Sequence, residues 1–179
     1  MAERYDDWDI KMMSPARRRH IEVAGNIFRI FSSYLRGKTC KIYSDGRPIK
    51  ISDEIKEKYK DRWEKDFKKP FPKKYFLPDL MIVCNPAIDK DRWVDGAPAL
   101  IIEILSLGTL EIDKTIKRDI YKDIGVKEYW LVDCDDSDSI TIIDFDSDKE
   151  TELNEDDNPQ FSSVNFPDLV IDFNEIFEE

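Results

Sequence analysis

Apolar residues recur along the first part of this chain with the spacing of one buried helix face. Within residues 14–35 they lie three or four positions apart: Ile21, Ala24, Ile27, Phe28, Phe31 and Leu35. Ser14-Pro15 has the residue types that begin a helix, and Gly37 has the residue type that follows its end. The pattern therefore predicts an N-terminal helix within 14–35.

Four largely apolar stretches predict the strands of the core. Residues 77–84 and 99–105 are almost continuously apolar, which is typical of strands covered on both faces. A helical pattern follows over 111–124, and two further strands are predicted at 128–133 and 139–145. This order of elements predicts an α/β fold with a mixed central β-sheet flanked by helices.

The remaining segments are richer in charged and turn-forming residues. Asp45-Gly46 predicts the turn of a hairpin between two short strands. Residues 53–70 are highly charged and predict a helical insertion on the surface, with a narrow apolar stripe of Ile55, Tyr59, Trp63 and Phe67. Residues 146–159 are acidic and predict a loop. For a length of 179 residues we expect a single domain, 1–179.

Composition narrows the class of protein. Hydrophobic residues make up 41% of the chain, and no run of about 18 apolar residues occurs, so we expect a folded protein with no membrane partner. No basic-then-apolar leader opens the sequence, and we expect a cytoplasmic location. Cys40, Cys84 and Cys134 lie far apart, which predicts reduced thiols and no zinc site. The single histidine, His20, excludes multi-histidine metal sites.

Charge is divided unevenly along the chain. From residue 133 onward there are 17 acidic residues and one basic residue, whereas residues 1–132 hold 27 basic and 22 acidic residues. The most basic stretch is 47–74. Two explanations stay open for each part: the basic stretch is a solvated helix face or a surface for phosphates, and the acidic part maintains solubility or faces away from DNA.

The stretch PALIIEILS places the carboxylate of Glu103 in the middle of a predicted buried strand. An unpaired ionised carboxylate in apolar surroundings costs several kcal/mol. Because side chains alternate along a strand, Ile101, Glu103 and Leu105 share one face. Asp79 begins the preceding strand, and if the two strands pair side by side, Asp79 lies close to Glu103.

The predicted helix over 111–124 carries a polar stripe beside its apolar one. Its apolar stripe must face the sheet and consists of Ile112, Ile116, Ile120 and Ile124. One position further on, Asp113, Lys117 and Tyr121 follow one another at four-residue spacing. We expect Lys117 at the boundary of the buried face, close to the strand of Glu103, and Lys114 in solvent.

Two carboxylates and a lysine at one sheet edge suit phosphodiester hydrolysis. Mg²⁺ takes oxygen ligands from one or two carboxylates and completes its shell with water and substrate phosphate. We expect Asp79 and Glu103 to bind Mg²⁺ or Mn²⁺, and Lys117 to orient or deprotonate the attacking water. Simpler explanations stay open: Asp79 starts a strand, Glu103 is a buried partner of Lys117 or Arg118, and Lys117 extends into solvent.

These residues resemble the PD-(D/E)xK nuclease superfamily, and most of all the Uma-two family of restriction-endonuclease-like proteins. The match includes the helix of Ser14-Pro15 and His20 and the FPDLVIDFNEIF ending. The other matching positions are Pro78-Asp79, Glu103, Leu105-Ser106, Asp113, Lys117, Tyr121, Gly125-Val126, Glu128-Tyr129-Trp130 and Asp133. One departure is plain, because the superfamily's lysine two residues after the glutamate is Leu105 here. This departure makes Lys117 the candidate for the missing lysine.

The resemblance implies a restriction-endonuclease-like core and a Mg²⁺-dependent endonuclease that hydrolyses DNA, with Asp79 and Glu103 as the metal ligands. Glu22, on the first helix, is a further candidate metal contact. DNA is the implied partner, and a homodimer is implied if both strands are cut.

We also expect Asp113 and Tyr121 to position Lys117 through contacts along their stripe. Two other functions stay open. One is a catalytically inactive module of the same fold that binds nucleic acid or a protein partner, and the other is an enzyme that acts on RNA or on a small phosphodiester.

Overall fold

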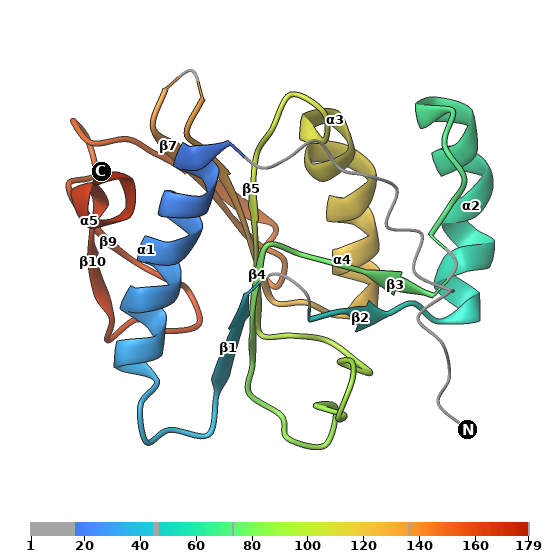
Figure 1. The fold of residues 1–179 in the computed structure, drawn as a ribbon, viewed down its shortest axis with the longest axis horizontal. Helices are drawn as coiled ribbons and strands as arrows, with labels where there is room; N and C mark the ends of the chain where they lie inside the picture. Colours follow the sequence, from blue (N-terminus) through green and yellow to red (C-terminus); the bar gives the residue numbers. More distant parts are fainter. Residues whose placement is uncertain (1–16, 45–46, 73, 136, 179) are drawn as a thin grey trace.

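The computed structural model describes residues 17–44, 47–72, 74–135 and 137–178. Its centre is a six-stranded sheet in the order β1-β4-β5-β6-β7-β8, in which every neighbouring pair is antiparallel except β5 and β6 (Figure 1). The strands are β1 (Lys41–Ser44), β4 (Leu80–Val83), β5 (Leu100–Ile104), β6 (Glu128–Asp133), β7 (Ser139–Asp144) and β8 (Lys149–Leu153). The predicted mixed α/β fold is confirmed.

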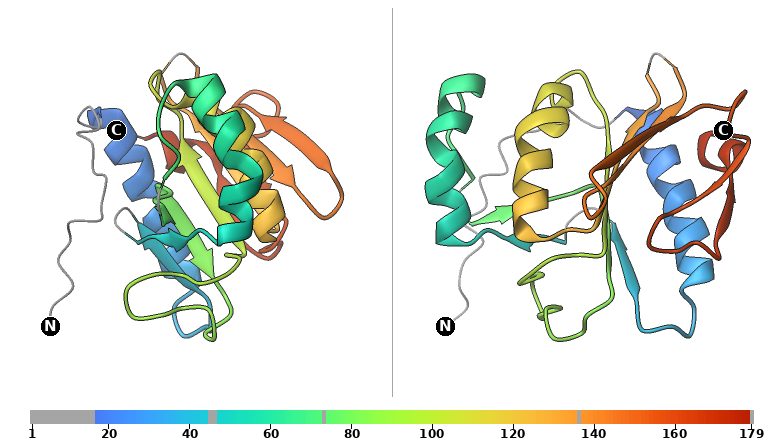
Figure 2. Two further views of the ribbon diagram at one scale, coloured as in Figure 1. Left: turned by 90° about the vertical axis from the view of Figure 1, so that its right-hand side faces the viewer. Right: turned by 180° about the vertical axis from the view of Figure 1, so that it is seen from behind.

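Helices cover both faces of this sheet (Figure 2). On one face lie α1 (Arg18–Tyr34), α5 (Phe173–Phe177) and a small sheet of β9 (Gln160–Ser162) and β10 (Val170–Asp172). On the other face, α3 (Leu110–Ile112), the π-helical turn η2 (Asp113–Lys117) and α4 (Arg118–Ile124) form one continuous helix. Outside that helix packs α2 (Asp53–Phe67), at the right of Figure 1.

Strand β5 separates the two apolar cores. Leu100, Ile102 and Ile104 belong to the core under α1, whereas Ile101 and Leu105 belong to the core under α4. The predicted alternation is therefore confirmed. This alternation places Glu103 on the face covered by the η2–α4 helix, where its side chain is buried.

The predicted apolar stripe of the long helix also faces the sheet. Ile112, Ile116 and Ile120 are buried, and Ile124 packs partly buried against the same core. Gly125 ends the helix with a positive φ of 96°, a conformation that glycine adopts without steric cost. Local periodicity thus fixes which face of this helix meets the strand of Glu103.

The predicted hairpin does not form. Strand β1 pairs with β4 in the main sheet, whereas β2 (Ile49–Lys50) pairs with β3 (Tyr75–Phe76) in a separate sheet. Residues 45–46, the predicted turn, lie outside the described residues. Long-range pairing across the core outweighs the local turn signal here.

The N-terminal helix differs from its prediction at its first turn. The described helix begins at Arg18, and Ser14-Pro15 lies outside the described residues. Ile21 is 60% exposed, and Val23 is buried instead, because the core-facing stripe runs through Val23, Ile27 and Phe31.

The two highly charged segments, 53–70 and 146–159, contain different secondary structure. The apolar stripe of α2 is buried at Ile55, Tyr59 and Trp63, so the predicted surface helix is confirmed, although its status as an insertion stays a prediction. The acidic stretch 146–159 is not a loop throughout, since β8 occupies Lys149–Leu153 and pairs with β7.

The state of the cysteines also departs from the prediction. Cys40 and Cys84 are joined by a disulfide that links β1 to β4, and Cys134 is a buried free thiol. The two bonded cysteines directly extend the Lys41–Val83 pair of the two strands, so their approach follows from a strand pairing that the sequence did not reveal. In the part of the chain that the structure describes, no helix combines the length and the apolar character of a membrane span.

Candidate active site

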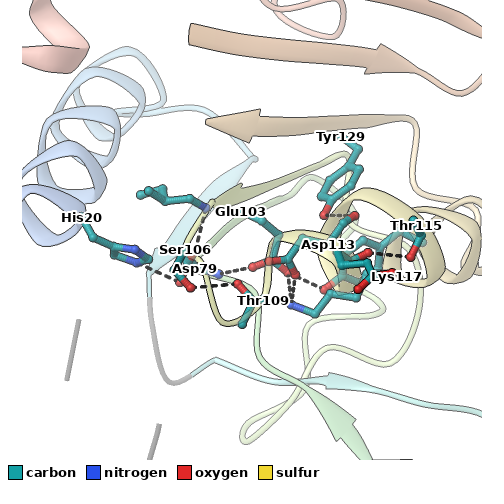
Figure 3. A network of polar contacts seen from close by, with 12 residues as sticks. His20, Asp79, Glu103, Ser106, Thr109, Asp113, Thr115, Lys117 and Tyr129 are labelled. Carbon is teal, nitrogen blue, oxygen red and sulfur yellow. Dashed lines mark hydrogen bonds and ion pairs between the residues drawn. The ribbon is translucent and has the colours of Figure 1, made fainter. Parts of the chain in front are cut away.

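Asp79 and Glu103 lie side by side where strand β4 begins and strand β5 ends. Leu80 pairs with Ile102 across the antiparallel strands β4 and β5, so the next residues along each strand, Asp79 and Glu103, are neighbours. The Asp79 carboxylate accepts a hydrogen bond from the Ile104 N–H at 2.7 Å, and the Asp79 N–H donates to Glu103 Oε2 at 3.4 Å. The structure confirms the predicted approach of the two carboxylates (Figure 3).

Lys117 reaches the same cluster from the helix. Its Nζ donates a hydrogen bond to Glu103 Oε1 at 2.9 Å and forms an ion pair with Asp113 Oδ1 at 2.7 Å. The Tyr121 hydroxyl donates to the same Glu103 Oε1 at 2.8 Å. Two residues of the predicted stripe, Lys117 and Tyr121, therefore contact Glu103, and the third, Asp113, contacts Lys117.

Exposure distinguishes the members of this cluster. The side chains of Glu103 and Asp113 are almost completely buried, whereas those of Asp79 and Lys117 retain 24% and 13% of their exposure. A ligand that approaches from solvent therefore meets Asp79 and Lys117 first, with Glu103 behind them.

The electrostatics of the cluster are unbalanced. Burial raises the pKa of Glu103 to about 8; the Lys117 ammonium opposes this rise, and Asp113 and Asp79 add to it. Burial favours the neutral amine of Lys117, but Glu103 and Asp113 outweigh it and hold the lysine pKa well above its usual value. Three carboxylates thus share one ammonium, and the site favours additional positive charge.

A π-helical turn shapes the helix at this point. In the segment Asp113–Lys117 the Thr115 hydroxyl donates to the Glu111 carbonyl at 2.5 Å, and the Tyr129 hydroxyl donates to the Asp113 carbonyl at 3.1 Å. Side chains therefore satisfy carbonyl groups where the regular α-helical pattern is interrupted. Such turns inside α-helices are frequent at functional sites.

Glu22 does not join the carboxylate cluster. Its carboxylate accepts a hydrogen bond from Arg18 Nε at 2.6 Å on the same helix, and we find no contact with Asp79 or Glu103 among the described residues. His20 reaches Asp79 instead, with Nε2 at 3.3 Å from Asp79 Oδ1. The sequence does hold a signal for His20, because it continues the buried stripe of Val23 and Ile27 at three- and seven-residue spacing.

The donor set fits a hard divalent cation. Asp79 and Glu103 offer carboxylate oxygens in a site with excess negative charge, which a cation would neutralise. Among the described residues no group of three or more His, Cys, Asp or Glu side chains has the arrangement of a metal site. Mg²⁺ commonly binds one or two carboxylates and takes water and substrate phosphate in its remaining positions, so Asp79 and Glu103 would suffice as its protein ligands.

Basic residues near the ends of α1 and α4 pair with the acidic C-terminal part of the chain. The ion pairs are Arg17–Asp135, Arg19–Asp138, Arg118–Glu150, Lys122–Asp148 and Lys127–Asp146. Ion pairs therefore join the basic part of the chain, residues 1–132, to its acidic C-terminal part at the surface. The expectation that the basic part faces DNA and the acidic part faces away stays a prediction.

Comparison with known proteins gives this geometry a context. The family model of Uma2, described as "Putative restriction endonuclease", matches residues 2–173. The chain belongs to the Uma2 family. A solved structure described as "a putative nuclease belonging to DUF820", from Anabaena variabilis, is 14% identical with a TM-score of 0.68, covering 90% of this chain and 82% of that chain. Among curated proteins, no match to the chain is found.

The family match covers nearly the whole chain, and the structural match shows a fold shared with that DUF820 protein. The predicted resemblance to the restriction-endonuclease-like Uma2 family is therefore confirmed. Neither match assigns a role to an individual side chain.

Proposed function

We propose that this Uma2 protein is a Mg²⁺- or Mn²⁺-dependent endonuclease that hydrolyses DNA phosphodiester bonds. One observation carries the proposal: Asp79, Glu103 and Lys117 converge where β4 begins and β5 ends, and Asp79 and Lys117 reach solvent. The family description as a restriction endonuclease supports DNA as the substrate. If both strands of a duplex are cut, two copies of the chain would act together.

In this proposal Lys117 acts as a fixed positive charge. Because its pKa is held well above the usual value, Lys117 stays protonated at neutral pH and is unsuited to serve as a general base. Its contacts with Glu103 and Asp113 fix the ammonium where it can stabilise negative charge that develops on the phosphate.

Asp79 and Glu103 would hold the cation. When bound, the cation supplies polarisation of the phosphodiester and a water of lowered pKa. Tyr121 and Lys117 both donate to Oε1 of Glu103, so Oε2, whose neighbour is the Asp79 N–H at 3.4 Å, is the oxygen left for the cation. Tyr121 thus orients the Glu103 carboxylate, while Asp113 anchors Lys117.

A second candidate function is an inactive nuclease-fold module that binds nucleic acid or a protein. The observation that favours it is that Lys117 and Tyr121 already engage Glu103 Oε1. A stable Glu103–Lys117 pair with no affinity for divalent cations would be a purely structural element.

Cleavage assays separate these functions. We expect the purified chain to nick supercoiled plasmid with Mg²⁺ or Mn²⁺ but not with EDTA, and Asp79→Asn to lower the rate at least about 100-fold. Asp168→Asn is the matched control, because Asp168 also follows a proline but lies exposed near β10. Cleavage of RNA with DNA left intact would change the substrate class. No cleavage and no Mn²⁺ binding would favour the inactive module.

A further inference from the structure

His20 lies against the candidate active site although it comes from a different layer of the fold. It sits in the first turn of α1, and Figure 3 shows its ring beside Asp79, on the side of the carboxylates opposite to Lys117. The imidazole Nε2 is 3.3 Å from Asp79 Oδ1, and the His20 side chain is 20% exposed.

The chemistry of this contact assigns the direction of the hydrogen bond. An ionised carboxylate only accepts hydrogen bonds, so the Nε2 of His20 carries the proton and donates it to Asp79 Oδ1. The other oxygen, Oδ2, accepts from the Ile104 N–H at 2.7 Å. Each oxygen of Asp79 is therefore held by a donor from a different element, α1 or β5.

These two hydrogen bonds fix the orientation of the Asp79 carboxylate. Asp79 precedes β4 and is partly exposed, so packing alone does not fix its carboxylate plane. Metal-binding carboxylates are commonly oriented by such outer hydrogen bonds, which leave lone pairs for the metal. The first turn of α1 carries the His20 ring and supplies a donor for that purpose from outside the strands β4 and β5.

We propose that His20 is a positioning residue that orients Asp79 for a divalent cation. The inference rests on the proposed function, since it takes Asp79 as a metal ligand. Loss of an outer hydrogen bond of this kind typically weakens metal affinity 10–100-fold. His20→Phe should therefore weaken Mn²⁺ binding by roughly that factor. His20→Gln should bind Mn²⁺ within about threefold of the wild type, because its amide nitrogen can replace the Nε2 donor.

The test is calorimetric titration of the full chain with Mn²⁺, with the unfolding midpoint of each variant measured in EDTA. Ile21→Ala is the matched control, because Ile21 is the next residue on α1 and is 60% exposed. If His20→Phe lowers the unfolding midpoint, His20→Ala replaces it, and rescue by His20→Gln remains the deciding comparison. Wild-type Mn²⁺ affinity in a folded His20→Phe or His20→Ala variant would overturn the inference.

Two further measurements separate the inference from the proposed function. Unchanged Mn²⁺ affinity in Asp79→Asn would contradict the metal site itself, whereas loss in Asp79→Asn with no loss in His20→Phe would contradict His20 alone. Because His20 is the single histidine of the chain, electron spin-echo spectroscopy of the Mn²⁺-loaded, untagged protein reports on it directly. We expect no directly coordinated imidazole nitrogen; such a signal would make His20 a ligand and overturn the positioning role.

Discussion

Glu103 and Glu128 are both carboxylates buried in the central sheet, on the neighbouring strands β5 and β6. They point to opposite faces, since Glu103 meets Lys117 of the long helix, and Glu128 meets Ser163 in the segment between β9 and β10. The two residues thus solve the same physical problem, the burial of a carboxylate, with different partners.

Glu128 is surrounded by neutral donors. Its oxygens accept hydrogen bonds from Trp130 Nε1 at 2.7 Å, Ser163 Oγ at 2.7 Å, the Val164 N–H at 3.0 Å, the Asn165 N–H at 2.9 Å and Asn165 Nδ2 at 3.0 Å. These bonds tie the segment between β9 and β10 to the sheet. Glu128 therefore has the partners of a structural anchor.

Glu103 shares its charged partner with a second carboxylate. Lys117 contacts both Glu103 and Asp113, and Asp79 lies alongside, so negative charge remains in excess. Burial alone therefore does not mark a functional carboxylate. The identity of the partners and the nearness of solvent distinguish an anchor such as Glu128 from the site that we propose to bind a cation.

The largest expected effect concerns the ammonium group of Lys117, which Glu103 holds in place. Lys117→Met should lower DNA nicking about 100–1,000-fold, because the variant removes the cation that stabilises charge on the phosphate. Lys114→Met is the matched control, since Lys114 lies on the same helix but is exposed. Nicking rates are measured with Mn²⁺. An equal fall of the rate in both variants would contradict a specific role of Lys117.

Removal of the anchor should instead act on stability. Glu128→Ala should lower the free energy of unfolding by at least about 3 kcal/mol, because each buried donor left without a partner costs about 1–3 kcal/mol. Glu103→Ala should cost less, since Lys117 keeps Asp113 as a partner. Urea unfolding in EDTA measures both values, and a greater loss in Glu103→Ala would contradict the assignment of Glu128 as the anchor.

The pH dependence of stability should report on Glu103. In the unfolded chain this group ionises near pH 4.5, whereas burial raises its folded-state pKa to about 8. The folded state therefore binds the extra proton between these values, and the stability that this proton contributes is lost as pH rises toward 8.

A glutamine at position 103 removes this linkage. Glu103→Gln should gain up to a few kcal/mol of stability relative to the wild type at pH 9, with little difference at pH 4. Urea unfolding in EDTA at both pH values checks the result. A stability difference that does not change with pH would mean that Glu103 has no raised pKa.

The smallest expected effect belongs to the hydroxyl that orients Glu103. Tyr121→Phe removes the 2.8 Å hydrogen bond to Glu103 Oε1 and should cost about 1 kcal/mol of stability. It should also slow nicking up to about tenfold, an expectation for an orienting contact. Tyr129→Phe is the control, because its hydroxyl contacts the backbone of Asp113 instead. Equal rates for both variants would remove Tyr121 from the site.

Local periodicity was sufficient to predict much of the candidate site. Alternation in β5 placed Glu103 on the correct face, and four-residue spacing aligned Asp113, Lys117 and Tyr121 toward it. These relations depend on the geometry of single elements. The sequence predicts the approach of Asp79 only on the condition that its strand pairs with β5, and the structure supplies that pairing.

Relations between distant elements were not predictable in this way. His20 and Glu22 lie two residues apart on α1, which places them about 200° apart around the helix, so that one at most faces Asp79. The packing of α1 in the folded chain places His20 beside Asp79, from which it is separated by 59 residues in the sequence. Glu128 likewise depends on donors 35–37 residues later, and no local pattern marks them.

We propose that Glu103 belongs to a nuclease site and that Glu128, although equally buried in the sheet, does not. Plasmid nicking with Mn²⁺ by folded Glu103→Gln and Glu128→Gln variants tests this proposal most directly. We expect the rate per folded molecule to fall at least about 100-fold in Glu103→Gln and to stay within a few-fold of the wild type in Glu128→Gln. Wild-type rates in Glu103→Gln would contradict the claim.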